Sequence, residues 1–209
     1  MLAACITLTV AAVLALLVAE HRENRWLQRT AKLSASCGFI ATAWQAGALD
    51  SGFGRTMFVA IVACAIGDAC LLSRAQRWFL AGLVAFALGH LGYALAFASR
   101  ELAVTQAVIL GAALLAPAWL VWRWLGPHVA VDMRRPVLAY VAIITAMVTC
   151  AWSCDAGAST WGLRIGATAF YLSDLAVARD VFVRRAFVNR LWGLPMYYAA
   201  QLMLAVAAG

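Results

Sequence analysis

The chain has 209 residues, of which 66% are hydrophobic and only 12% are charged, and its formal net charge is +7. A soluble domain of this length would carry about twice that proportion of charged residues, so the composition excludes an ordinary soluble protein and indicates an integral membrane protein. The cations lie at the ends of apolar segments, which makes them topology signals; we therefore expect the phospholipid bilayer, and no nucleic acid, as a partner.

Hydropathy predicts an all-α fold, a polytopic membrane bundle of eight transmembrane helices. The expected spans are residues 2–19, 32–49, 55–72, 78–97, 102–124, 136–154, 160–178 and 190–208. The connections between them are short, so the whole chain, residues 1–209, is predicted to form a single integral membrane domain. The first apolar run has no basic segment before it and no convincing cleavage site, and we expect it to be retained as a helix.

Lysine and arginine alternate between the two sides of the predicted bundle. The segments after the first, third, fifth and seventh spans hold thirteen of the sixteen cations, and the alternate connections hold only Arg55, Arg100 and Arg164. By the positive-inside rule, the first group of connections is cytoplasmic. We therefore expect a multi-pass protein of a bacterial inner (cell) membrane with both termini on the non-cytoplasmic side.

Two of the nine acidic residues lie deep inside apolar segments. Asp68 follows Gly67 near the end of the third span, and Asp174 follows Ser173 near the end of the seventh. Each lies about four residues before the cytoplasmic end, which at about 1.5 Å per residue places it roughly 6–8 Å below the surface. Carboxylates at membrane depth are costly, so they tend to be paired and functional.

Two carboxylates in one low-dielectric site cannot both ionise cheaply, so the pair can hold a single proton at neutral pH. Such a pair supplies one acid and one base, as acid-catalysed hydrolysis requires. A structural interpretation stays open, in which each aspartate accepts hydrogen bonds from hydroxyls or pairs with a cation such as Lys32. The sequence also leaves open which aspartate is the acid.

Further polar side chains are expected around the aspartates. Tyr140 is placed at a similar depth, whereas His90 is placed near the bilayer centre with Tyr93 on the same helical face. The candidate supporting residues are Lys32, His90, Tyr93, Tyr140, Ser173, Tyr197, Tyr198 and Gln201. No second intramembrane imidazole accompanies His90 and no cofactor motif occurs, so we expect neither a metal ion nor a cofactor.

Lys32 is expected at the start of the second span, at the cytoplasmic interface. There it is either a topology charge that reaches the lipid headgroups, a partner of an aspartate, or a ligand of a lipid phosphate together with Arg74 or Arg77. The two aspartate-bearing segments also share a basic turn and a following helix that starts near Trp78 or Trp192. This order suggests a four-plus-four pseudo-repeat; coincidence of membrane-helix composition is the alternative.

Several segments together form a more specific pattern. They are Gly67-Asp68, the run from Phe79 to Phe86 that leads to His90 and Tyr93, Gly166-Ala167 to Phe170, Ser173-Asp174, and Tyr197-Tyr198-Ala199-Ala200-Gln201. In order and spacing, over nearly the whole chain, the sequence resembles the YhhN-type lysoplasmalogenase family. The resemblance implies an ether-bond hydrolase in the membrane, which converts the lysolipid lysoplasmalogen to a fatty aldehyde and glycerophosphoethanolamine or glycerophosphocholine. It implies functional positions at Lys32, Asp68, His90, Tyr93, Asp174 and Gln201.

The chemistry of a vinyl ether fits the two carboxylates. An acid protonates the β-carbon, an anion stabilises the resulting oxocarbenium ion, and a base assists the addition of water, so Asp68 and Asp174 are the predicted catalytic residues. A proton-coupled small-molecule transporter would use the same paired carboxylates and is the main alternative. An intramembrane aspartyl protease is less favoured because Ala65-Ile66-Gly67-Asp68 lacks the full Gly-x-Gly-Asp pattern. A structural scaffold is the remaining alternative.

Overall fold

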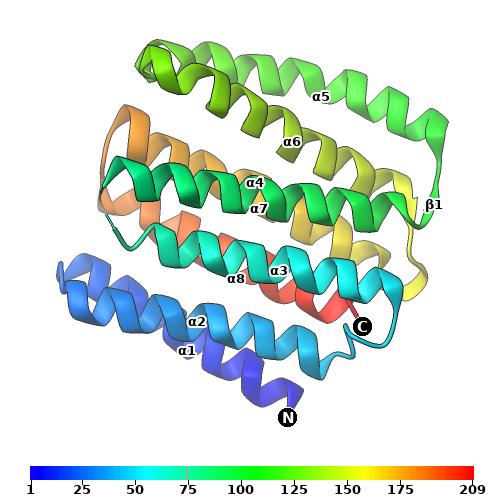
Figure 1. Ribbon diagram of the computed structural model, residues 1–209, viewed down its shortest axis with the longest axis horizontal. Coiled ribbons are helices and arrows are strands. Elements are labelled where there is room, and N and C mark those ends of the chain that lie inside the picture. Colours follow the sequence, from blue (N-terminus) through cyan, green and yellow to red (C-terminus); the bar gives the residue numbers. More distant parts are fainter. Residues whose placement is uncertain (74) are drawn as a thin grey trace.

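A computed structural model of the chain describes residues 1–73 and 75–209. Within these residues, eight α-helices form an antiparallel bundle with both termini at one end (Figure 1). The helices are α1 (Leu2–His21), α2 (Arg25–Gln45), α3 (Gly52–Cys70), α4 (Gln76–Ala98), α5 (Val104–Leu125), α6 (Arg134–Ser153), α7 (Thr160–Ala178) and α8 (Phe187–Ala207). The predicted all-α class is confirmed.

Short elements occupy the connections. At the end that holds the termini, β1 (Glu101–Leu102) pairs antiparallel with β2 (Cys154–Asp155), and this pair ties the α4–α5 connection to the α6–α7 connection. The 3-10 turns η1 (Gly126–His128) and η2 (Val131–Met133) join α5 to α6, and η3 (Gly157–Ser159) precedes α7. The connections are short, as the sequence predicts, and consecutive helices lie side by side apart from α4 and α5, which both pack on α6.

Consecutive helices make the most extensive packing, α1 with α2, α3 with α4, and α7 with α8. Between these pairs, α4 packs on α6, α8 packs on α1 and α2, and α5 lies outermost, on α6 (Figure 1). Glycines permit the closest approaches. A Cβ at Gly89 of α4 would lie 2.5 Å from Cys64 Sγ of α3, and one at Gly193 of α8 would lie 2.5 Å from the Cβ of Ala176 of α7.

Five of the described helical segments are long and apolar enough to cross a membrane: Leu2–His21, Gly52–Cys70, Gln76–Ala98, Val104–His128 and Val131–Ser153. In α5 only Leu125 is buried, as expected of a helix whose other sides contact lipid. The other three helices, α2, α7 and α8, are not among these segments. The protein is thus an integral membrane protein.

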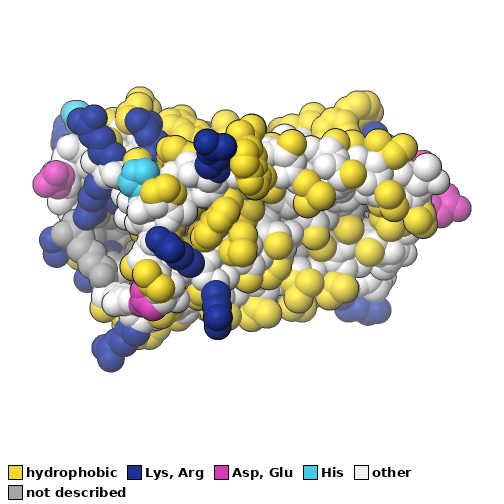
Figure 2. Space-filling model, turned by 90° about the horizontal axis from the view of Figure 1, so that it is seen from above, with side chains coloured by type: hydrophobic (Ala, Val, Ile, Leu, Met, Phe, Trp, Pro, Cys, Tyr) yellow, Lys and Arg dark blue, Asp and Glu magenta, His cyan; other side chains and the backbone are white. Residues whose placement is uncertain are grey.

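The charges are distributed unevenly along the bundle. We call the end formed by the α1–α2, α3–α4, α5–α6 and α7–α8 connections the basic end. On the face shown in Figure 2, most lysine and arginine side chains gather at this end, and apolar side chains cover the middle. The sequence places most cations in every second connection, and the antiparallel bundle brings these connections together at one end.

The predicted start of the second helix, at residue 32, is wrong. Helix α2 begins at Arg25, where the side chain of Asn24 caps it by accepting a hydrogen bond from Leu27 N at 3.1 Å. Its first two turns hold the polar residues Arg25, Gln28, Arg29 and Thr30, so a search for long apolar runs misses them. Lys32 consequently lies about two turns inside the helix, away from the interfacial position that the sequence suggested.

Helical backbone also continues beyond the predicted end of the seventh span. A π-helical turn, η4 (Arg179–Val183), follows α7, and Asp174 therefore precedes the end of helical backbone by nine residues, instead of about four. Asp180 fixes the next segment, since its Oδ1 accepts hydrogen bonds from Ala186 N at 3.0 Å and Asn189 Nδ2 at 3.1 Å. We call residues 179–186 the strap.

Candidate active site

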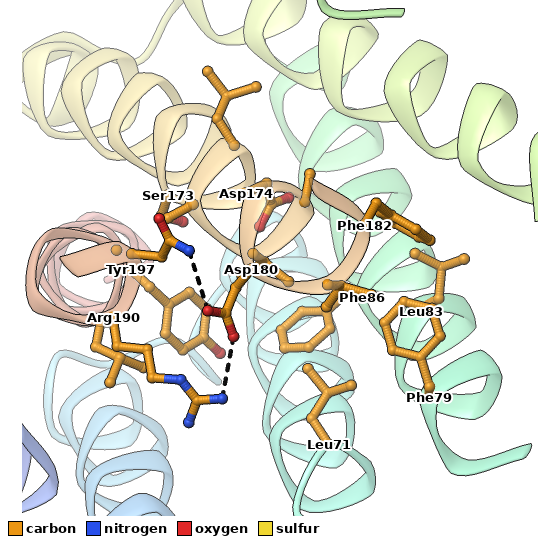
Figure 3. Close-up of a pocket in the computed structure, with 18 of the residues that line it drawn as sticks. Leu71, Phe79, Leu83, Phe86, Ser173, Asp174, Asp180, Phe182, Arg190 and Tyr197 are labelled. Carbon is orange, nitrogen blue, oxygen red and sulfur yellow. Dashed lines mark hydrogen bonds and ion pairs between the residues drawn. The ribbon is translucent and has the colours of Figure 1, made fainter. Parts of the chain in front are cut away.

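A cavity of about 830 Å³ extends from the basic end into the bundle and reaches both intramembrane aspartates. Asp68 comes from α3 and Asp174 from α7, and part of the strap lies over the cavity. Lys32 and Tyr140 also line it, as do Ser173 and Tyr197, which Figure 3 shows at the cavity. Six of the ten residues proposed from the sequence therefore border one space.

Asp68 is 2% exposed, and donors surround its carboxylate. Lys32 Nζ lies 3.1 Å from Oδ1, while Ser36 Oγ and Tyr197 OH each donate to Oδ2 at 2.8 Å. A buried carboxylate with a cation and two hydroxyl donors is well compensated in its ionised form. The pairing of Asp68 with Lys32, which the sequence left open, is therefore present.

A chain of hydrogen bonds leads away from Asp68 into the bundle. Gln201 Nε2 donates to Tyr197 OH at 3.4 Å, and Tyr93 OH donates to Gln201 Oε1 at 2.7 Å. Each donor points along the chain toward the carboxylate, so the bonds polarise one another in the direction that favours an anion at Asp68. Tyr198 takes a separate position, because its hydroxyl donates to the backbone oxygen of Lys32 at 3.4 Å.

Asp174 has different partners and greater access to the cavity. Its side chain is 18% exposed, and its Oδ2 accepts a hydrogen bond from Tyr140 OH at 2.7 Å. His90 Nε2 lies 3.2 Å from the same oxygen and 2.9 Å from Tyr140 OH, so the three groups form a triangle. His90 is fully buried and its Nδ1 has no hydrogen-bond partner among the described residues.

The unpaired Nδ1 of His90 indicates the tautomer of the imidazole. A buried N–H without an acceptor is more costly than a bare ring nitrogen. The geometry therefore favours the tautomer with its proton on Nε2, facing Asp174 and Tyr140. In that form His90 and Tyr140 both present a donor to the triangle.

An aromatic pair separates the two carboxylate networks. The rings of Phe86 and Phe170 pack edge to face, with their centroids 6.4 Å apart. The centroid of the Phe170 ring lies 4.4 Å from that of His90 and 5.2 Å from that of Tyr197. A Cβ at Gly67 would lie 2.7 Å from the Phe86 ring, so the glycine before Asp68 makes room for this ring. The two aspartates line the same cavity but take hydrogen bonds from separate sets of donors.

The cavity has two walls of different character. The polar wall, from α1, α2 and α8, comprises Glu20, Arg25, Arg29, Lys32, Asn189 and Arg190. The apolar wall, from α4, α5 and α6, comprises Phe79, Leu83, Val121, Val137, Val141 and Ile144. Figure 3 shows Arg190 on one side of the cavity, Phe79 and Leu83 on the other, and Asp174 between them.

The strap joins these walls. Arg190 pairs with Glu20 of α1 and, at 3.1 Å, with Asp180 of the strap. On the other side, the ring of Phe182 packs edge to face against that of Phe79, with the ring centroids 5.9 Å apart. The strap is therefore held by charge on the polar side and by apolar packing on the apolar side.

Some sequence predictions need correction here. The predicted depths separate His90 from Asp174, yet the two side chains are in contact; the continuation of helical backbone through Val183 explains why counting from residue 178 misplaced Asp174. Ser173 lines the cavity, but its hydroxyl donates to Phe170 O at 2.7 Å. Arg77 is exposed and is not among the described lining residues. Arg74 lies outside the described residues.

The sequence analysis did not include Ser36, and it named Phe86 and Phe170 only as parts of the family pattern and not as site residues. Helical spacing could have identified them, since each lies on the same helical face as a candidate residue, four positions away. Ser36 follows Lys32 by four, Phe86 precedes His90 by four, and Phe170 precedes Asp174 by four. As to a metal ion, the described residues contain no group of three or more His, Cys, Asp or Glu side chains that could hold one.

The fold and the cavity define a polytopic membrane protein with two buried carboxylate networks on one cavity. The sequence profile of the YhhN family matches residues 27–208, and the chain belongs to this family. No solved structure matches the chain.

Curated relatives are similar over most of the chain. It is 33% identical over 161 residues to lysoplasmalogenase TMEM86A of Bos taurus, in an alignment that covers 73% of this chain and 64% of the relative. It is 36% identical over 161 residues to lysoplasmalogenase TMEM86B of Homo sapiens, which covers 76% of this chain and 66% of the relative. The chain thus spans slightly less than two thirds of the length of these relatives.

Proposed function

We propose that this protein is a lysoplasmalogenase, an enzyme that hydrolyses the vinyl-ether bond of a lysolipid in the membrane. One observation carries the proposal: two aspartates with different partners line a single cavity that has a polar wall and an apolar wall. A lysolipid has the same division, with a charged headgroup, one apolar chain and the reactive bond between them. The names of the curated relatives support the same reaction.

The reaction needs an acid and an anion at different atoms of the vinyl ether. A carboxylic acid transfers its proton to the β-carbon, where the electron pair of the double bond forms the new C–H bond. The α-carbon and the ether oxygen then share the positive charge of an oxocarbenium ion. Water adds to the α-carbon, and the hemiacetal collapses to the aldehyde and the alcohol of the glycerophospho-base.

In this proposal Asp68 is the anion. Lys32 and two hydroxyl donors compensate its negative charge, and the chain from Tyr93 through Gln201 and Tyr197 is polarised toward it. A fixed anion beside a developing cation stabilises the transition state without reorganisation during the reaction.

Asp174 is the proposed acid. Unlike Asp68, it has no lysine or arginine partner among the described residues, and it is the more exposed of the two carboxyl groups. A carboxyl group that borders the cavity without a paired lysine or arginine can meet the β-carbon of the substrate as an acid. After proton transfer, the proton that water releases on addition returns to the Asp174 carboxylate and regenerates the acid. Tyr140 and His90 hold this carboxyl group in position.

We further propose that all eight helices span the membrane, with the basic end on the cytoplasmic side of an inner (cell) membrane. The concentration of cations at one end supports this orientation, which leaves both termini on the other side (Figure 2). A four-plus-four pseudo-repeat remains part of the proposal, because α3 packs with α4 as α7 packs with α8. Each aspartate belongs to the first helix of its pair.

Purified protein incubated with matched alkenyl, alkyl and acyl lysolipids tests the function. We expect fatty aldehyde from the alkenyl substrate and no product from the alkyl ether. Fatty acid from the acyl substrate without aldehyde from the alkenyl one would assign a different hydrolase activity. If no product forms from any of the three lysolipids and a solute enters sealed vesicles, the protein is a transporter. The enzyme names of the relatives do not favour this interpretation.

A further inference from the structure

The two walls of the cavity also specify how a substrate lies in it. On α4, α5 and α6 the described lining side chains are apolar apart from Gln76 at the basic end and Tyr140. On α2, the lining residues Arg25, Arg29 and Lys32 follow one another at helical spacing. The lining cations of α2 and α8 thus lie on different helices from the apolar wall, although Leu16 of α1 and Leu194 of α8 also add apolar side chains to the polar side.

We propose that the apolar wall is the subsite for the alkenyl chain, and that the chain lies against Val141 and Ile144 while the phosphate lies toward Arg25 and Arg29. This inference rests on the proposed function and deepens it. The proposed occupant is a single hydrocarbon chain, because the apolar wall is continuous with the cavity that holds both carboxyl groups, and the exposed Arg25 and Arg29 of the polar wall can meet a phosphate. Apolar lining at this position favours burial of methylene groups over water.

The position of Asp174 agrees with this orientation. Tyr140, which donates to Asp174, lies on α6 between Val137 and Val141, whereas Asp68 pairs with Lys32 of the polar wall. In a vinyl ether, the β-carbon is on the chain side of the bond and the ether oxygen is on the glycerol side. A substrate bound in this orientation presents the β-carbon toward Asp174 and the charged C–O unit toward Asp68.

Ile144 is the residue through which the subsite can be changed with least effect on the carboxyl groups. It is 3% exposed and lies one helical turn beyond Tyr140, so a larger side chain there would shorten the apolar wall without replacing a hydrogen-bonding group. The Ile144→Trp variant should therefore discriminate between substrates by the length of their chain. Val141→Phe provides a second variant that narrows the same wall if Ile144→Trp does not fold.

The experiment compares aldehyde release from alkenyl lysolipids with short chains (about eight carbons) and long chains (about sixteen carbons). We expect Ile144→Trp to lower the long-chain to short-chain ratio of kcat/KM about tenfold, which corresponds to lost burial of about two methylene groups. Val108→Trp, at a position on α5 that is 67% exposed, is the matched control and should leave the ratio unchanged. An unchanged ratio in both Ile144→Trp and Val141→Phe would overturn the proposed orientation.

A binding measurement separates this inference from the proposed function. If the wild-type protein releases no aldehyde, the proposed function is wrong, but the subsite can still be tested with radiolabelled alkyl-ether lysolipids of the same two lengths. Weaker binding of the long chain to Ile144→Trp, with short-chain binding retained, supports the subsite. Equal binding of both chains to the wild-type protein and to the variant contradicts it.

Discussion

Asp68 and Asp174 lie on one cavity but have opposite surroundings. Asp68 is buried beside Lys32 and accepts two hydroxyl hydrogen bonds, whereas Asp174 contacts the cavity and has a tyrosine and a histidine as partners. A lysine compensates the negative charge of Asp68, and Asp174 has no lysine or arginine partner among the described residues. In the proposed mechanism these neighbours give two chemically identical side chains different roles.

The comparison also concerns the walls beyond each carboxyl group. Lys32 connects Asp68 to the polar wall, and Tyr140 connects Asp174 to the apolar wall. The two carboxyl groups therefore lie at the boundary between the two kinds of lining. A substrate with a charged end and an apolar end can occupy both sides at once with its reactive bond at the boundary.

Replacing either cavity aspartate by asparagine should have the largest effect on activity. Asp68→Asn and Asp174→Asn should each lower kcat/KM for aldehyde release by roughly 10²–10⁴-fold, because one loses the anion and the other the proton donor. Asp132→Asn changes an exposed carboxylate at the basic end and should keep full activity. Full activity in both cavity variants, measured in the same detergent, would exclude the two-aspartate mechanism.

Lys32 should matter for stability as much as for activity. Lys32→Met leaves the Asp68 carboxylate buried without its cation, a change that costs about 3–5 kcal/mol of folding free energy. Thermal unfolding in detergent would reveal this as a lower melting temperature. The double variant Lys32→Met, Asp68→Asn should recover stability but not activity, and no recovery would mean that Lys32 stabilises the fold through other contacts.

Tyr140 and His90 should act together on Asp174. Tyr140→Phe and His90→Phe should each reduce kcat about tenfold, or roughly 1.4 kcal/mol of transition-state stabilisation. Because the two side chains hold the same carboxyl oxygen, the double variant should lose less than the sum of the two free-energy changes. If the free-energy changes of the two single variants add up to that of the double variant, the two side chains act independently.

The smallest effects should follow the hydrogen-bond chain away from Asp68. Tyr197→Phe removes a direct donor and should lower unfolding free energy by about 1–3 kcal/mol, because Gln201 also loses its acceptor. Tyr93→Phe removes the outermost donor, so it should cost about 1 kcal/mol and change kcat less than Tyr197→Phe does. A larger loss of kcat in Tyr93→Phe than in Tyr197→Phe would contradict a chain that acts through Asp68.

The sequence was sufficient for the class of fold because apolar runs of membrane length have few alternatives. It was less reliable where a helix starts in polar residues, as α2 does at Arg25, or continues into an irregular turn, as α7 does through Val183. Both errors have the same cause, since hydropathy detects contact with lipid and not the hydrogen bonds of the backbone.

The same limit applies to the cavity. Composition and depth singled out Asp68 and Asp174, but partners such as Ser36 and the ring of Phe170 depend on which helices pack together. Only the packing of α7 against α8 and of α4 against α6 decides that Tyr197 reaches one carboxylate and His90 the other. The unequal character of the two carboxyl groups therefore emerges from tertiary structure.

Chemical rescue by a small carboxylic acid tests this inequality most directly. Asp174→Ala and Asp68→Ala would each be assayed for aldehyde release with and without formate, between about pH 5 and pH 8, where formate is mostly ionised. If Asp174 is the acid, the rate of Asp174→Ala with formate follows the scarce protonated form and falls about tenfold per unit rise in pH. In Asp68→Ala, the ratio of the rate with formate to the rate without it stays nearly constant, because Asp174 supplies the proton in both measurements. The reverse dependence, or the same dependence in both variants, would contradict the assignment of Asp174 as acid and Asp68 as anion.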